Sequence, residues 1–153
     1  AIIAPYQLDG GGCISYLTIE HKGSIDPALR KGIGNRIFGC DDCQIYCPWN
    51  KFAQPTNEPD FSPRHHLDQS GLADLFKWTE AEFLSKTQGS AIRRTGYEGW
   101  LRNIAVALGN ASYSAEIVSL LEQRRHSASE LVQEHIDWAL TQQMQKQTPK
   151  PVD

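Results

Sequence analysis

The sequence predicts a mainly α-helical fold in which a cysteine-rich segment precedes a set of antiparallel helices. Three observations lead to this prediction. Three of the four cysteines fall within residues 40–47, a proline-rich polar stretch follows them, and apolar residues then recur at helical spacing. We therefore divide the 153 residues into a cysteine-rich segment (1–52), a connector (53–78) and a helical domain (79–153).

The cysteine-rich segment contains the run C-x2-C-x3-C-P, formed by Cys40, Cys43, Cys47 and Pro48. This run matches the end of the bacterial ferredoxin signature, whose last cysteine ligates a different 4Fe-4S cluster from the others. Isoleucine stands where the signature has its first cysteine, so Cys13 is the remaining candidate. The four cysteines therefore divide into three ligands of one cluster and one ligand of a second, in a ferredoxin-like segment.

Two other uses of the cysteines fit the sequence less well than iron–sulfur binding. A disulfide between Cys40 and Cys43 needs a thioredoxin-like strand-to-helix context, which the flanking sequence does not supply. A four-thiolate zinc site usually takes two C-x2-C pairs, and only one is present. The spacing favours iron–sulfur clusters, whose thiolates indicate a reducing, cytoplasmic compartment. The ligand count also leads us to expect further cysteines upstream of Ala1.

Local signals predict the elements around the cysteines and the connector. Residues 14–20 are apolar enough for a buried helix or strand, and Asp26 before a proline predicts the N-cap of a short helix. The connector contains the adjacent histidines His65 and His66. No partner ligand stands at a fixed helical offset from them, which favours a solvated loop pair over a metal site.

Helix signals dominate residues 79–153. Thr79 with Glu82, and Ser127 with Glu130, match the capping box of helix starts. Short loops between the predicted helices make neighbours antiparallel. Residues 131–140 are similar to the second helix of a HEAT repeat, so we expect HEAT-like packing. The residues predicted to be buried are Trp100, Leu101, Ile104, Ala105, Leu108, Ile117, Leu120, Leu121, Leu131, Val132, His135, Ile136, Ala139 and Leu140.

The charge of the chain does not by itself indicate a polyanionic partner. A net charge of −3 gives no general attraction to nucleic acids, so binding requires a local basic surface. Two groups of basic residues are candidates, because arginines bind phosphates and exposed aromatic rings stack on unpaired bases. One group, which accompanies Tyr97 and Trp100, is Lys51, Arg93, Arg94 and Arg102, and the other, between the cluster cysteines, is Lys22, Arg30, Lys31 and Arg36. The alternative is that Trp100 belongs to the core and the arginines are solvated. No apolar run reaches the roughly 18 residues of a membrane helix, and we expect no membrane association.

Four segments of the sequence resemble the epoxyqueuosine reductase family. They are CISYLTIE (13–20), IGNRIFGCDDC (33–43), CPWNKFA (47–53) and GYEGWLRNIAVALGN (96–110). The resemblance covers nearly the whole chain. It implies that Cys13, Cys40 and Cys43 ligate one 4Fe-4S cluster and that Cys47 ligates the other.

The resemblance also implies an activity for the complete protein. Members of the family reduce epoxyqueuosine to queuosine at the wobble position of certain transfer RNAs, using cobalamin and two 4Fe-4S clusters. The expected partners are the tRNA anticodon stem-loop and an external electron donor, and we expect a monomer. The proton donor and the cobalamin domain are expected upstream of this chain, which alone would then be inactive.

Two acidic residues are candidates for the face that meets cobalamin or tRNA. Glu20 and Asp41 both lie in the segments that carry the resemblance. Arg36 is a candidate to offset the cluster charge or to bind a phosphate. Alternatively, Glu20 is an exposed helix carboxylate and Asp41 caps the turn that carries the cysteines. The sequence departs from the family at Gly11 and Gly12, where basic residues are frequent.

Two other classes of function are left open by the sequence. An iron–sulfur electron carrier, or another cobalamin-linked reductase such as a dehalogenase, would use the cysteines but does not predict the HEAT-like helices. A non-catalytic tRNA-binding module would not need cluster thiolates.

Overall fold

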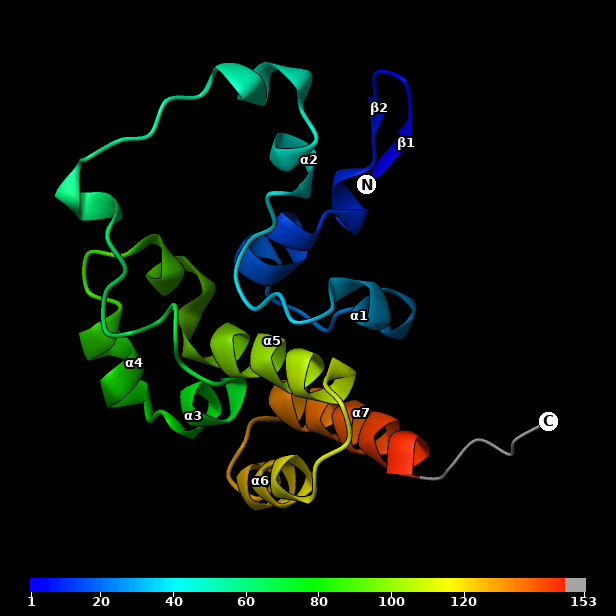
Figure 1. Ribbon diagram of the computed structural model, residues 1–153. Coiled ribbons are helices and arrows are strands. Elements are labelled where there is room, and N and C mark those ends of the chain that lie inside the picture. The colour runs from blue at the N-terminus through cyan, green and yellow to red at the C-terminus, as the bar shows by residue number, and fades with distance from the viewer. Residues whose placement is uncertain (148–153) are drawn as a thin grey trace.

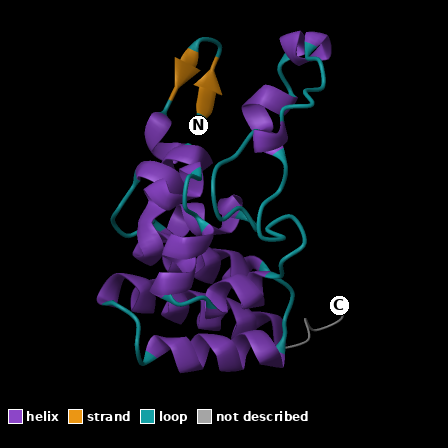
Figure 2. Ribbon diagram, turned by 90° about the vertical axis from the view of Figure 1, so that its left-hand side faces the viewer, coloured by secondary structure: helices purple, strands orange, loops and turns teal. Residues whose placement is uncertain are grey.

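Helices make up most of the computed structural model, which describes residues 1–147 (Figure 1). The chain begins with an antiparallel hairpin of β1 (Ile2–Ala4) and β2 (Gln7–Leu8), followed by α1 (Pro27–Ile33) and α2 (Asp42–Ile45). The later helices are α3 (Leu72–Lys77), α4 (Glu80–Lys86), α5 (Gly96–Asn110), α6 (Ala115–Arg125) and α7 (Glu130–Gln147). Within residues 1–147, the small hairpin is the one sheet (Figure 2). The mainly α fold is confirmed.

The elements near the cysteines are short and are held by local hydrogen bonds. The segment predicted as a helix or strand forms a single π-helical turn, Tyr16–Glu20. The Asp26 carboxylate accepts a hydrogen bond from the Ala28 amide at 2.8 Å, which confirms Asp26 as the N-cap of α1. The hairpin was not predicted, because its strands are too short for an alternating pattern to be recognised.

One of the two predicted capping boxes is present. The Thr79 hydroxyl accepts a hydrogen bond from the Glu82 amide at 3.3 Å, and the Glu82 carboxylate accepts one from the Thr79 amide at 2.8 Å. The prediction for Ser127 is wrong, because α7 begins only at Glu130 and Ser127 lies too far upstream to cap it. The Ser127 hydroxyl instead donates to the Arg124 carbonyl at the end of α6.

Helix α5 lies at the centre of the molecule. Helix α6 runs antiparallel to α5 and α7, while α7 runs in the same direction as α5 and packs most extensively against it (Figure 1). Every residue from 99 to 109 is buried. The predicted apolar face around Trp100 is therefore confirmed, but burial extends around the whole helix.

Two hydrophobic cores meet at α5. The larger core packs α5 against α3, α4, α6 and α7 and includes Phe76, Phe83 and Trp100. The smaller core joins Val106 of α5 to side chains of the cysteine-rich segment, namely Leu17, Ile25 and Ile33. Trp100 is 1% exposed, so the alternative that assigned it to the core is confirmed. The cysteine-rich segment is thereby fixed to the central helix.

The connector between the two parts is largely exposed. His65 and His66 have positive φ angles of 54° and 55° and lie on the surface, as the solvated-loop interpretation predicted. Among residues 1–147, the structure contains no helix with the length and hydropathy needed to cross a bilayer.

The close approach of α5 and α7 at Gly109 leads to a prediction about stability. A Cβ atom at Gly109 would lie 2.6 Å from the Trp138 ring and 2.9 Å from the Ala139 Cα. Because one of these atoms belongs to the backbone, Gly109→Ala must push the helices apart, and we expect a loss of about 3 kcal/mol. The matched control is Gly32→Ala in α1, where a Cβ meets nothing within 4 Å and stability should rise by about 0.5 kcal/mol. Urea denaturation of both variants measures the difference.

Candidate metal-cluster site

Three cysteines border one pocket. Cys13, Cys40 and Cys43 line a cavity of about 530 Å³ between the hairpin, the turn before α2 and α2 itself. The remaining lining is mostly apolar and includes Ile14 and Tyr46. The structure therefore brings together the three cysteines that were predicted to share a cluster, although they are up to 30 residues apart in the sequence.

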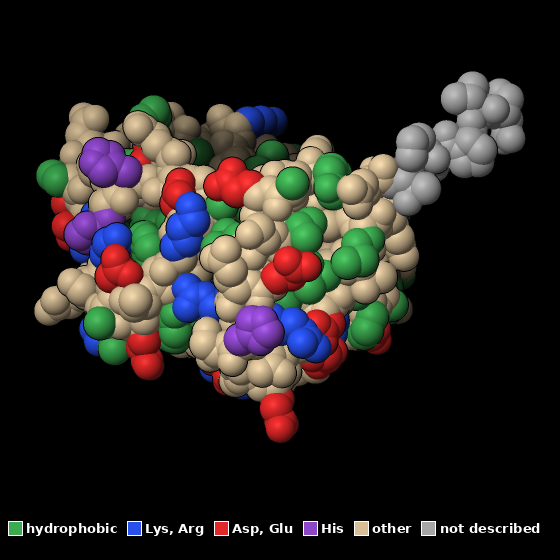
Figure 3. All heavy atoms as spheres, turned by 90° about the horizontal axis from the view of Figure 1, so that it is seen from below, with side chains coloured by type: hydrophobic (Ala, Val, Ile, Leu, Met, Phe, Trp, Pro, Cys, Tyr) green, Lys and Arg blue, Asp and Glu red, His purple; other side chains and the backbone are tan. Residues whose placement is uncertain are grey.

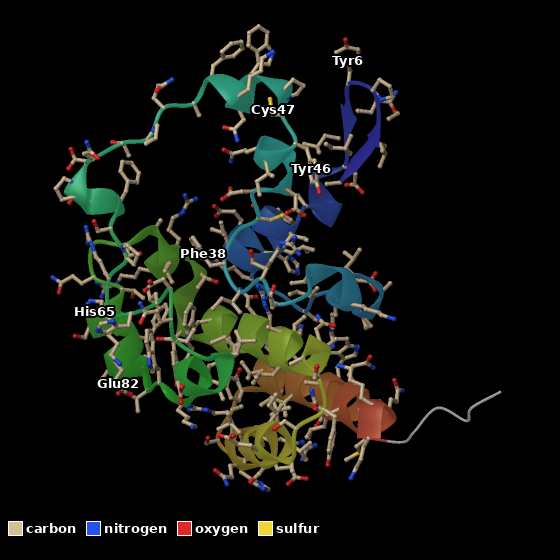
Figure 4. All side chains as sticks on the ribbon, viewed as in Figure 1. Tyr6, Phe38, Tyr46, Cys47, His65 and Glu82 are labelled. Carbon is tan, nitrogen blue, oxygen red and sulfur yellow. The ribbon has the colours of Figure 1, made fainter. Side chains whose placement is uncertain are left out.

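The fourth cysteine lies apart from the other three. Cys47 borders a different, open pocket of about 420 Å³ together with Trp49 and Phe52. Figure 4 shows Cys47 at the end of α2 that is farther from α5. Cys47 is also the residue before Pro48, which begins a 3-10 turn and leads the chain away from the first pocket.

Short backbone turns place Cys13 and Cys40. A 3-10 turn, Gly10–Gly12, precedes Cys13, whose amide donates to the Gly10 carbonyl at 3.1 Å. Gly39 precedes Cys40 and has a φ of 74°, a conformation that L side chains rarely adopt. The Ser15 hydroxyl accepts from the Cys40 amide at 2.9 Å and so joins the two turns.

One ion pair lies beside the cysteine pocket. The Arg36 guanidinium donates to both Asp42 carboxylate oxygens at 2.9 Å, and Asp42 lines the pocket. The hydrogen bond to Asp42 and its charge raise the pKa of Arg36 above its ordinary value, and Cys40 adds to this effect. Arg36 is therefore positioned to place positive charge near the thiols while remaining paired with Asp42.

The two acidic candidates have different environments. The Glu20 carboxylate forms an ion pair with Arg94. Asp41 occupies the N-cap position of α2 without a side-chain cap bond, and its carboxylate accepts from Nε2 of the Gln44 side chain at 3.3 Å. Neither side chain lines the cysteine pocket. Their assignment to a cobalamin or tRNA surface stays a prediction.

The basic and aromatic residues singled out in the sequence do not form one exposed surface. Arg102 is fully buried, and the Tyr97 hydroxyl donates to the Trp78 carbonyl at 2.7 Å. The hypothesis that Arg102 and Trp100 contact nucleic acid is therefore wrong, because both side chains are inside the protein. The alternative is right for Trp100 but wrong for Arg102, which is buried rather than solvated. On the face shown in Figure 3, basic and acidic side chains are interspersed without a continuous basic patch.

Sequence reasoning missed the polar side chains that hold the cysteine segment on α5. Arg102 donates to the Leu17 and His21 carbonyls at 2.7 Å, and Asn103 donates to the Thr18 carbonyl at the same distance. One signal was available. Residues 104–109 form an unbroken run of apolar and small residues, which is typical of a helix buried on all sides.

The donor set suits a cluster better than a single ion. Within residues 1–147, no three His, Cys, Asp or Glu side chains converge as a single metal ion requires. A zinc site needs all its thiolates within about 2.3 Å of one point. The three thiols of the pocket instead border a larger volume, as ligands on separate iron atoms of a cluster do.

The comparisons with known proteins define first a class and then a family. Residues 1–50 match the family model of a 4Fe-4S double cluster binding domain. The cysteine-rich segment therefore belongs to the class of iron–sulfur cluster-binding domains. Over 142 residues the chain is 63% identical to the epoxyqueuosine reductase of Xanthomonas campestris pv. campestris, covering 93% of this chain and 40% of that protein. The Pseudomonas aeruginosa enzyme is 60% identical over 92% of the chain. The chain belongs to the epoxyqueuosine reductase family.

Solved structures show the same fold. The epoxyqueuosine reductase from Bacillus subtilis superposes with a TM-score of 0.82 at 29% identity, over 93% of this chain and 38% of that one. An epoxyqueuosine reductase in complex with an epoxyqueuosine-modified tRNA-Tyr stem loop has a TM-score of 0.68 at 24% identity, over 94% of this chain and 47% of that one. The chain spans about two fifths of the length of the curated relatives it matches.

Proposed function

We propose that the complete protein reduces epoxyqueuosine to queuosine at the wobble position of tRNA. The observation that carries this proposal is the separation of Cys13, Cys40 and Cys43 from Cys47, in a chain that is 63% identical to an epoxyqueuosine reductase. The tRNA stem loop bound by a solved relative supports tRNA as the substrate. We place the reaction in the cytoplasm, in a monomer supplied by an external electron donor.

Within this function, the chain acts as a cluster-binding unit. Cys13, Cys40 and Cys43 would hold one 4Fe-4S cluster and Cys47 would supply one ligand to a second. When bound, such clusters supply one-electron transfer, and cobalamin supplies the reducing cobalt centre in the proposed reaction. The residues of this chain fix the thiols, keep the pocket apolar and place the Arg36 charge beside it. We keep 1–52 as the cluster-binding segment and 79–153 as the helical domain, and the end of the range 53–78 contributes α3 to the larger core.

The ligand split predicts how much iron the chain takes up. After anaerobic reconstitution with iron and sulfide, the 153-residue chain should bind at most one labile cluster, about four irons, since only one pocket has three thiols. Cys40→Ser should abolish this uptake. Cys47→Ser is the matched control and should leave it unchanged. Iron and acid-labile sulfide are measured, and stable binding of about eight irons per chain would contradict the split.

The reaction itself is tested in cells that lack the full-length protein. Epoxyqueuosine should accumulate in their tRNA, and the full-length gene should restore queuosine, whereas its form carrying Cys40→Ser should not. Nucleoside analysis of tRNA measures both compounds. If queuosine is normal in the deleted cells and the purified protein binds a cluster, the result would favour an electron carrier or a different cobalamin-linked reductase. A protein without iron would point to a tRNA-binding module.

A further inference from the structure

Asn103 of α5 joins the two backbone segments that lead to the cysteines of the pocket. Its side-chain amide donates to the Thr18 carbonyl at 2.7 Å and to the Ile37 carbonyl at 2.9 Å. The residue is 1% exposed, so water does not replace these bonds. Thr18 lies a few residues after Cys13 and Ile37 a few residues before Cys40, so one amide group bonds to both segments. The Thr95 hydroxyl also donates to the Thr18 carbonyl, at 2.9 Å, but makes no bond to the Cys40 side.

Further hydrogen bonds extend from these two positions to the cysteines. The Thr18 hydroxyl donates to the carbonyl of Ile14, which follows Cys13, at 2.8 Å. The same hydroxyl accepts from the amide of Gly39, which precedes Cys40, at 2.9 Å. A continuous set of bonds therefore runs from α5 to both sides of the pocket.

Arg102 determines the orientation of the Asn103 amide. The Arg102 guanidinium donates to the side-chain oxygen Oδ1 of Asn103 through Nη2 at 2.9 Å and through Nε at 3.1 Å. Because guanidinium groups only donate, the oxygen of Asn103 must face Arg102 and its NH2 group must face the two carbonyls. Arg102 also donates to the Gly23 carbonyl at 2.8 Å, which fixes its own position.

We propose that Asn103, oriented by Arg102, is a positioning residue that sets the separation between Cys13 and Cys40 and thereby the strength of cluster binding. The inference rests on the proposed function, in that it takes these thiols as ligands of one 4Fe-4S cluster. Asn103 does not line the pocket and acts through the backbone of residues 14–18 and 37–40. Groups that support metal ligands from outside typically change metal affinity by about 10- to 100-fold.

Asn110 provides a matched control on the same helix. Its side-chain amide donates to the Arg30 and Gly34 carbonyls at 2.9 and 3.0 Å. Like Asn103, it donates two side-chain hydrogen bonds to backbone carbonyls, but these bonds fix α1 rather than the segments that carry the cysteines. If the two side chains only stabilise the fold, substitutions at both positions should have the same effect on the rate of cluster loss. If Asn103 positions the cysteines, only its substitution should speed that loss.

The test compares Asn103→Ala with Asn110→Ala in the 153-residue chain. In the metal-free protein, Asn103→Ala should speed amide hydrogen exchange at residues 37–40, and Asn110→Ala at residues 30–34. After reconstitution with iron and sulfide, Asn103→Ala should lose its cluster to a chelator about 10-fold faster than the unmodified chain, and Asn110→Ala less than about twofold faster. Visible absorbance follows the loss.

If Asn103→Ala does not fold, the variant Asn103→Asp takes its place in the hydrogen-exchange and chelator experiments. Aspartate retains the oxygen facing Arg102 but has no NH2 group for the two carbonyls, so it should reproduce the faster exchange and cluster loss. Equal cluster lifetimes in the Asn103 and Asn110 variants would overturn the proposal, as would unchanged exchange at residues 37–40. If the unmodified chain binds no cluster, the exchange data decide the proposal, and unchanged exchange at residues 37–40 overturns it.

Discussion

Replacing the buried Arg102 by methionine is expected to lower the free energy of unfolding by about 4 kcal/mol. The guanidinium is fully buried and donates to the carbonyls of Leu17, His21 and Gly23. Methionine fills similar space but leaves these carbonyls without a donor. Burial lowers the pKa of Arg102 to about 10, so the group is still charged at neutral pH and its hydrogen bonds are charge-assisted.

The control for this variant is Arg125→Met. Arg125 pairs with Asp137, and both side chains are about half exposed. An exposed ion pair contributes at most about 1 kcal/mol, so this variant should be close to the unmodified protein. Urea denaturation at pH 7 gives both values. Similar losses in the two variants would show that the buried bonds of Arg102 contribute no more than a surface pair.

Acidification is expected to destabilise the protein through His135. This side chain is fully buried in α7, and burial lowers the pKa of His135 to about 4 from an ordinary 6.5. Its Nε2 accepts from the Ile25 amide at 3.2 Å, so Nδ1 carries the proton that is donated to the Leu131 carbonyl at 2.7 Å. Protonation of Nε2 would place its N–H opposite the N–H of Ile25, so that two donors face each other without an acceptor. The charges of Arg30 and Arg102 oppose it as well, while Glu134 favours it.

The sign and size of the effect follow from proton linkage. Between pH 6.5 and pH 4 the unfolded chain binds a proton at this histidine and the folded chain does not, so stability falls as the pH falls. The shift corresponds to about 3 kcal/mol over that range. His135→Gln keeps an acceptor for the Ile25 amide but does not titrate. The stability difference between the two proteins, from urea denaturation at pH 7 and pH 4.5, should shrink or reverse in acid. A constant difference would contradict the assignment.

Local features of the fold were predictable from the sequence because their causes are local. The Asp26 cap and the Thr79–Glu82 capping box depend on residues two or three positions apart, and both are present. The separation of Cys47 from the other cysteines follows from the spacing of one short motif. Ser127 shows the limit of this reasoning, because the capping pattern does not determine where the helix begins.

The polar contacts of α5 could not be predicted in the same way. Arg102 and Asn103 fall outside the apolar face defined by Trp100, Ile104 and Leu108, and such positions are ordinarily solvated. What covers them is a segment about 80 residues away in the sequence, as the bonds to Leu17 and Thr18 show. The pairing of these distant groups depends on tertiary packing, for which a helical pattern contains no signal.

The burial of α5 on both sides affects how the molecule can be dissected. A shortened chain that starts in the connector would retain α5 but lose the segment that covers Val106, Arg102 and Asn103. The apolar surface that this segment covers would then face water, and such a product would tend to associate with itself. Obtaining the helices alone therefore requires polar replacements on that surface. The connector, although exposed, does not mark a place where the protein divides into independent halves.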